Sequence, residues 1–175
     1  MKWAVAPLLI VAVPAAAQPS LQCVPKEEAA ALVTFALPTV VERLAERCRP
    51  ALPASAYLST YSGQLADRYR PDAASAWPTA RRAIGRLFSQ LLGQSMPAEM
   101  NSDMIRQLAE PAIASLLADK VKTTDCATAS EALQSLSALS GRDVGKLAAL
   151  GATIADRKGE GIAGVLKVCR PGDAR

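Results

Sequence analysis

The sequence has 175 residues, of which 50% are hydrophobic, and it carries a formal net charge of +4 at pH 7 but no histidine. The absence of histidine excludes Ser-His-Asp and Cys-His catalysis and removes the commonest zinc ligand. The mild positive charge is spread along the chain, so it does not indicate a nucleic-acid partner.

The first residues predict a secretory signal peptide. Lys2 precedes an apolar run over residues 3–13, and a small-residue A-x-A motif ends at Ala17. The apolar run is shorter than the ~18 residues that a membrane span needs. We therefore expect residues 1–17 to be removed on export, and residues 18–175 to form one domain in the periplasm or outside the cell, without a transmembrane span.

The clearest helical pattern lies between Cys23 and Cys48. Apolar residues recur there at helical spacing, Pro25 suits the first turn, and arginines follow at the C-terminal end. Phe35 lies off the main apolar stripe, which makes more than one face apolar. We therefore expect a central helix, with a kink at Pro38, where the proline ring removes a backbone donor.

All three tyrosines fall in one predicted element. The sequence predicts a second helix over about residues 54–69, a new start at Pro71, and a third helix that ends at Gly93. The tyrosines of the second helix predict either a face that binds a sugar, a peptide or a partner helix, or an amphipathic core stripe with hydroxyls at the surface. The core interpretation is favoured, because stripes at helical spacing are more often core than site. The three residues are Tyr57, Tyr61 and Tyr69.

The third predicted helix carries Arg81, Arg82 and Arg86 on the side away from its apolar stripe. Together they predict a cationic patch that could bind the phosphates of an anionic envelope polymer. The alternative is a solvated helix face. That alternative is favoured, because no aromatic residues lie between the arginines.

Three more helices complete the pattern. They cover about residues 104–121, a shorter stretch near 129–139, and residues 143–158, where Gly145 and Gly151 weaken the helix but allow close contact with a neighbour. No stretch shows sustained strand alternation. The sequence therefore predicts an all-α, single-domain bundle of about six helices.

Four cysteines without a C-x-x-C pair in an exported chain predict two disulfides rather than a metal or redox site. A helix over residues 25–47 spans ~35 Å at ~1.5 Å per residue, whereas bridged Cα atoms lie about 6 Å apart, so Cys23 and Cys48 should not pair. In an up-and-down bundle of six helices, the first, third and fifth helices start at the same end. This parity predicts the pairs Cys23–Cys126 and Cys48–Cys169, and one longer connector would change it.

The cysteine arrangement resembles that of small exported all-helical proteins of bacteria. These proteins carry two cysteines flanking the N-terminal part and two in the C-terminal part, with an aspartate-cysteine step such as Asp125-Cys126. The resemblance implies export and a helical fold. It implies nothing about mechanism, because the proteins that it brings together are uncharacterised.

Motifs for cofactor and metal chemistry are not supported by their context. The G-x-G-x-x-G match at residues 159–164 lacks the preceding strand that a dinucleotide site requires. Glu42 and Glu46 alternate with Arg43 and Arg47, which favours surface ion pairing over a shared proton or metal. We therefore expect no cofactor, no metal site and no identifiable catalytic residue.

Two hypotheses about function remain. The first is a non-enzymatic binding or structural protein of the cell envelope, whose partner is an envelope protein or an anionic envelope polymer. The second is a hydrolase or transferase that uses carboxylates and tyrosine. A cleft in which a tyrosine meets two carboxylates would favour the enzyme, whereas an open apolar groove would favour the binding protein. The lack of a recognisable nucleophile arrangement favours binding.

Overall fold

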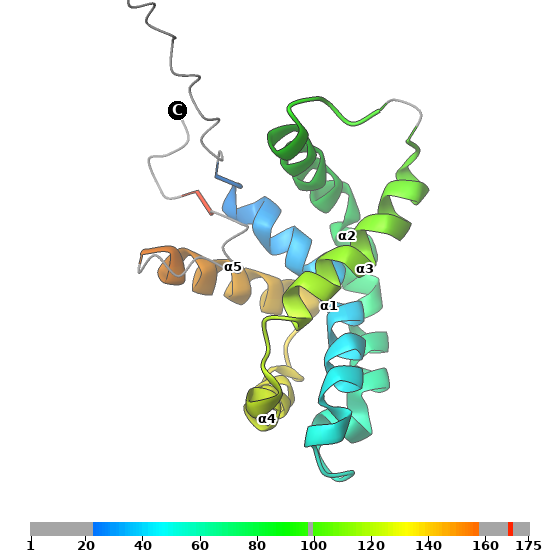
Figure 1. The fold of residues 1–175 in the computed structure, drawn as a ribbon, viewed down its shortest axis with the longest axis vertical. Coiled ribbons are helices and arrows are strands. Elements are labelled where there is room, and N and C mark those ends of the chain that lie inside the picture. Colours follow the sequence, from blue (N-terminus) through cyan, green and yellow to red (C-terminus); the bar gives the residue numbers. More distant parts are fainter. Residues whose placement is uncertain (1–22, 98–99, 158–167, 170–175) are drawn as a thin grey trace, which may run out of the picture.

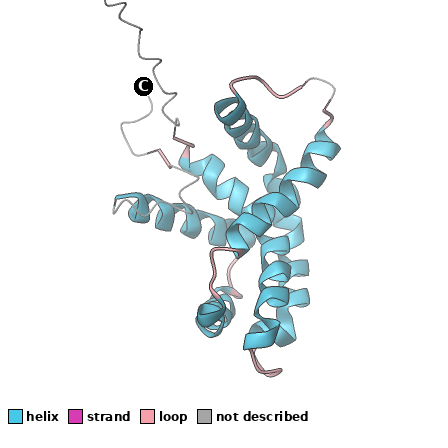
Figure 2. Cartoon of the chain, viewed as in Figure 1, coloured by secondary structure: helices cyan, strands magenta, loops and turns pink. Residues whose placement is uncertain are grey.

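The structure, a computed structural model, describes residues 23–97, 100–157 and 168–169 (Figure 1). The predicted signal peptide and the glycine-rich match at 159–164 lie outside these residues. Within the described part the only extended pairing is an isolated bridge between Val24 and Val168, and the predicted all-α class is confirmed (Figure 2). The elements are α1 (Lys26–Cys48), the 3-10 helix η1 (Arg49–Ala51), α2 (Tyr57–Leu92), α3 (Ser102–Ala118), the 3-10 helix η2 (Thr123–Asp125), α4 (Cys126–Leu136) and α5 (Gly141–Arg157).

Helix α1 lies at the centre, as the two apolar faces of its sequence predict. It packs against α2, α5 and α3, and Figure 1 shows it running through the middle of the molecule. Phe35 and Val41 are both fully buried, at 0% exposure, although they belong to different core clusters. The first cluster surrounds Phe35 near the start of α1, and the second surrounds Val41 and Leu44 near its end. A helix that contributes to two clusters must be covered on several sides.

Helix α2 is one helix of 36 residues, so the predicted break at Pro71 is wrong. Pro71 and Pro78 both lie inside it, and each leaves one carbonyl of the preceding turn without a helical donor. Both prolines are exposed, as are the residues four positions earlier, so water can reach the freed carbonyls. Leu65 and Ala80, on either side of the prolines, are buried, and this packing holds the helix together. The described residues therefore contain five α-helices rather than six.

All four cysteines lie in disulfides, as predicted, but the predicted pairing is wrong. The bonds join Cys23 to Cys169 and Cys48 to Cys126. Because α2 is continuous, Cys126 begins the fourth α-helix instead of the fifth, and it therefore lies at the end where α1 stops. The prediction that Cys23 does not pair with Cys48 is confirmed. Cys169 instead returns beside the start of α1, where its N–H donates to the carbonyl of Val24 at 2.9 Å.

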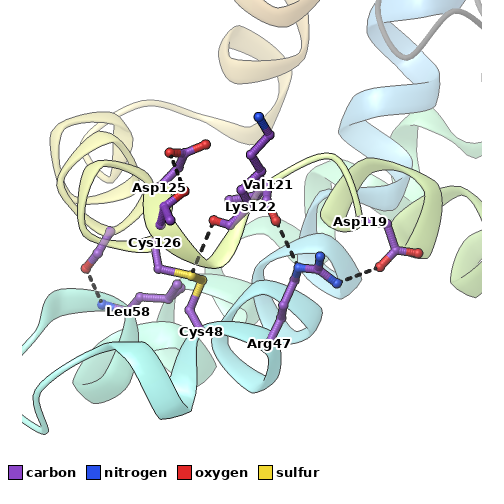
Figure 3. Close-up of a disulfide and its surroundings, with 10 residues drawn as sticks. Arg47, Cys48, Leu58, Asp119, Val121, Lys122, Asp125 and Cys126 are labelled. Atoms are coloured by element: carbon purple, nitrogen blue, oxygen red, sulfur yellow. Dashed lines mark hydrogen bonds and ion pairs between the residues drawn. A yellow bond between two sulfur atoms is a disulfide. The ribbon is translucent and has the colours of Figure 1, made fainter.

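The Cys48–Cys126 bond lies inside the core, with polar contacts around it (Figure 3). Arg47, next to Cys48, donates from Nε to the carbonyl of Val121 at 2.9 Å and forms an ion pair with Asp119 at 3.0 Å. Both partners belong to the segment that leads from α3 to α4. The disulfide and Arg47 therefore attach this segment to the end of α1.

Helix α5 is attached to both α1 and α2. The N–H of Gly141, at its start, donates to Oδ2 of Asp72 in α2 at 2.8 Å, and Arg142 forms an ion pair with Oδ1 of the same carboxylate at 3.0 Å. A carboxylate at this end also compensates the positive end of the helix dipole. One turn later Gly145 packs directly against Thr34 of α1, which confirms the expected close helix contact.

No helix in the described ranges combines the length and the hydropathy that a membrane crossing requires.

Candidate functional site

The three tyrosines of α2 do not share one surface. Tyr69 is 1% exposed and its hydroxyl donates to the carbonyl of Leu136 at 3.2 Å, so it is a core residue. Burial raises the pKa of Tyr69 above its ordinary value, and the nearby phenol of Tyr57 raises it further. Tyr57 is half-buried and its ring centroid lies 5.3 Å from that of Tyr61, which is 45% exposed. Among the three tyrosines, only Tyr57 and Tyr61 could therefore offer a ring to a ligand.

The enzyme hypothesis requires a cleft in which a tyrosine meets two carboxylates. Three cavities that lie between described residues have no tyrosine in their walls. The same part of the chain contains no group of three or more cysteine and carboxylate side chains that could hold a metal ion. Neither of these two features adds support for acid-base or metal chemistry at Tyr57, Tyr61 or Tyr69.

The three arginines separate into two environments. Arg81 and Arg82 line a cavity, whereas Arg86 lies one turn further along α2 and faces α1. The Nε of Arg86 is 3.2 Å from Oε2 of Glu28, whose side chain is only 9% exposed. That oxygen is buried and makes no hydrogen bond of acceptable geometry to any described residue, so the contact with Arg86 is an ion pair without a hydrogen bond. Arg86 therefore neutralises a buried carboxylate.

The cavity at the other two arginines has a volume of about 400 Å³ and opens between the middle of α2 and the start of α3. We call it the arginine pocket; its walls are Trp77, Pro78, Arg81, Arg82 and Ser102.

The indole of Trp77 positions the two helices that form the arginine pocket. Its Nε1 donates to Oγ of Ser102 at 3.0 Å, which links α2 to the first residue of α3. Its ring packs at a tilt against Phe35 of α1, with 4.9 Å between ring centroids. The first turn of α3 is itself fixed by Asn101, whose side chain accepts from the N–H of Met104 at 2.8 Å. The walls of the pocket thus come from α2 and α3, and α1 supports the indole from behind.

The arginine pocket is electrostatically positive. Arg81 and Arg82 are exposed, and neither has an ion-pair partner among the described residues. Arg82 donates to Oγ1 of Thr79 at 3.1 Å, which orients its guanidinium. The amino end of α3, where Ser102 lies, adds a positive partial charge, although Asp103 in the same turn reduces it. The arrangement can bind an anionic oxygen group with an uncharged part against the indole.

The other two cavities are less suited to an anion, because each contains both signs of charge. One lies between the ends of α1 and α3, where Arg43 pairs with Glu46 and Arg47 pairs with Asp119. The other lies between the starts of α1 and α5 and has a glutamate, Glu27, in its wall. The arginine pocket alone among the three has only positive charges in its wall.

Sequence reasoning identified the arginines but not their aromatic and hydroxyl neighbours. No binding role for Trp77 or Ser102 was predicted. The signal was present for Trp77, because Arg81 follows it by four residues and must lie beside it on a helix. No local signal could reveal Ser102, which comes from another helix.

No protein-family model, curated protein or solved structure matches this chain.

We expect Arg86→Gln to lower the free energy of unfolding by about 1 to 3 kcal/mol, because the variant leaves the buried Glu28 carboxylate without its cation. Arg86 is itself 56% exposed, which favours the lower part of this range. Urea unfolding followed by circular dichroism measures the change. The control is Arg82→Gln, an exposed arginine without an ion pair in the described residues, which should change stability by less than ~0.5 kcal/mol. Equal losses in the two variants would contradict the assigned role of Arg86.

Proposed function

We propose that this chain is a non-enzymatic binding protein of the periplasm or the cell exterior, and that the arginine pocket binds phosphate groups of an anionic envelope polymer. The observation that carries the proposal is the pair of guanidinium groups, without ion-pair partners among the described residues, beside an indole and the start of a helix. Guanidinium forks match phosphate oxygens in geometry and charge.

The location is supported by two independent features. Two disulfides staple the fold, and such bonds persist in oxidising compartments outside the cytoplasm. The sequence begins with the charge, apolar run and A-x-A motif of a secretory signal. Export would then carry the arginine pocket, which lies after the predicted signal, into the envelope.

A titration with a linear poly(glycerol phosphate) tests the proposal. The full chain is expressed with export, purified, and its N-terminus is read by mass spectrometry. Once residues 1–17 are removed, Trp77 is the only tryptophan left, because the other is Trp3. With excitation selective for tryptophan, the fluorescence then reports on Trp77 in the wall of the arginine pocket. Binding should change the emission of Trp77, and an uncharged dextran of equal length should not.

The double variant Arg81→Gln/Arg82→Gln should raise the dissociation constant at least about tenfold, because two charge-assisted hydrogen bonds are lost. The negative slope of log affinity against log salt concentration should become shallower by about two, one for each lost phosphate contact. The matched control is Arg49→Gln/Lys122→Gln, which removes the same charge at exposed positions outside the pocket. Unchanged affinity in the pocket variant, or an equal loss in the control, would reject the proposed site.

A further inference from the structure

Helix α3 exposes a continuous apolar stripe. Met104, Leu108 and Leu116 are 47%, 62% and 52% exposed, and the exposed Ala112 lies between them at the same spacing of four. We call these four residues the outer stripe of α3. At ~1.5 Å per residue it is ~18 Å long. Single exposed apolar residues are common, but an ordered row of them marks a contact surface.

Arg106 and Glu110 of α3 face α1, whereas Asp103 and Gln107 are exposed. Glu110 accepts a hydrogen bond from Oγ1 of Thr39 in α1 at 2.7 Å. The guanidinium of Arg106 lies 6.0 Å from the ring centroid of Phe35, also in α1, and forms an ion pair with Glu110 at 4.0 Å. Ile105, Ala114 and Ala118 of the same helix are buried, so α3 is apolar on its inner side and also on its outer side. An apolar outer side on a helix that already packs against α1 is explained if a second surface covers the outer stripe.

The outer stripe is complementary in shape to itself when reversed. In an antiparallel pair centred on residue 110, Met104 lies opposite Leu116 of the partner subunit, and Leu108 lies opposite the small Ala112. Each large side chain next to the axis then meets a small one, so the two helices can approach closely. A parallel pair would instead place Leu108 against Leu108 and leave a gap between the two Ala112 residues.

The charges at the two ends of the outer stripe favour the same antiparallel arrangement. Asp103 precedes the stripe and Lys120 follows it, and both are exposed without an ion pair in the described ranges. Antiparallel pairing sets the end of α3 that carries Asp103 beside the end of the partner subunit's α3 that is followed by a lysine. It also sets the two helix dipoles in opposition. A parallel pair would place like charges together at each end.

We propose that two copies of this chain associate through the outer stripe of α3, antiparallel about a two-fold axis that passes near residue 110. Such an interface is isologous, so it closes at the dimer and does not build filaments. A single helix pair forms a small interface, so we expect a dissociation constant in the micromolar range. The dimer does not depend on the arginine pocket and is tested separately from it.

Sedimentation equilibrium of the purified exported protein tests the dimer directly. The mass should rise with concentration from one chain to two and no further. Leu108→Glu should weaken self-association at least tenfold, because two carboxylates would enter the apolar contact. Leu108 is 62% exposed, so this variant should fold, which a circular dichroism melt verifies. The matched control is Leu147→Glu on α5, where the leucine is 49% exposed and outside the outer stripe.

Charge exchange and cross-linking test the orientation. Asp103→Lys should weaken the dimer, and adding Lys120→Asp should restore it. A photo-reactive p-benzoylphenylalanine at Met104 should cross-link to a peptide that contains Leu116. The proposal is overturned by a wild-type monomer throughout the micromolar range, by a dimer that Leu108→Glu leaves intact or Leu147→Glu abolishes, or by cross-links between the two copies of position 104. Binding of the monomer to phosphatidylcholine vesicles, without self-association, would assign the stripe to a lipid surface and likewise overturn it.

Discussion

Gly145→Ala is expected to destabilise the protein by about 2 to 3 kcal/mol, although alanine is the better helix former. A Cβ at this position would lie 2.6 Å from the carbonyl oxygen of Ala30 and would also overlap Oγ1 of Thr34. The Thr34 hydroxyl can rotate, but the Ala30 carbonyl is part of the α1 backbone. Relief therefore requires α5 to move away from α1. Chemical unfolding of the two proteins measures the loss.

Gly151→Ala provides the matched control in the same helix. A Cβ at Gly151 meets no atom within 4 Å. The substitution should therefore stabilise the protein by about 0.5 to 1 kcal/mol through helix propensity alone. Opposite signs for the two glycines would locate the effect in the contact between α1 and α5. A stabilising Gly145→Ala would show that this contact is looser than described.

Replacing the core disulfide, as Cys48→Ala/Cys126→Ala, should lower the free energy of unfolding by about 4 kcal/mol, because the bond closes a long loop in the unfolded chain. The two cysteines are 78 positions apart in sequence. Both are buried, at 0% and 1% exposure, in the cluster that contains Leu58. A loss of this size is a large fraction of the ~5 to 15 kcal/mol that stabilises a typical domain. Urea unfolding under non-reducing conditions measures it.

The second disulfide provides the comparison. Cys23 and Cys169 are 146 positions apart, so loop entropy alone would make their bond slightly more stabilising than the core bond. Both cysteines are only half-buried, however, and they attach the short bridge between Val24 and Val168. This bridge can open locally without unfolding α1 to α4, so Cys23→Ala/Cys169→Ala should cost less global stability. A greater loss than in the core variant would contradict this local opening.

The helical class and the central position of α1 could be predicted because they follow from local periodicity. Phe35, off the main stripe, already indicated that α1 is covered on more than one side. The continuity of α2 could not be predicted in the same way, because Pro71 is a local signal for a break. The packing of Leu65 and Ala80 against the rest of the protein outweighs that signal. Such packing involves residues far apart in the sequence, so the residues near Pro71 do not indicate it. The wrong disulfide pairing is a direct consequence of this one error.

The candidate site shows the same limit. Arg81, Arg82 and Arg86 look equivalent on a helix, but Glu28, 58 positions before Arg86, makes one of them different. Ser102 reaches Trp77 across the connection between α2 and α3. The role of Asp72 as a cap for α5 depends on a residue 69 positions away. Helical spacing predicts neighbours within an element, whereas partners from other elements are set by the packing of the whole chain.

The nested arrangement of the disulfides constrains the order in which the chain can be oxidised. Cys23 and Cys48 are synthesised first, and an oxidant that joined cysteines as they emerged would form a bond that the folded protein does not contain. Helix α1 keeps them apart, because its 23 residues span ~35 Å once the helix has formed. Cys48 can then form its native bond only after Cys126 has been synthesised, and Cys23 can form its native bond only after Cys169 has been synthesised. If α1 forms before oxidation, its length therefore keeps the two earliest cysteines from making a wrong bond.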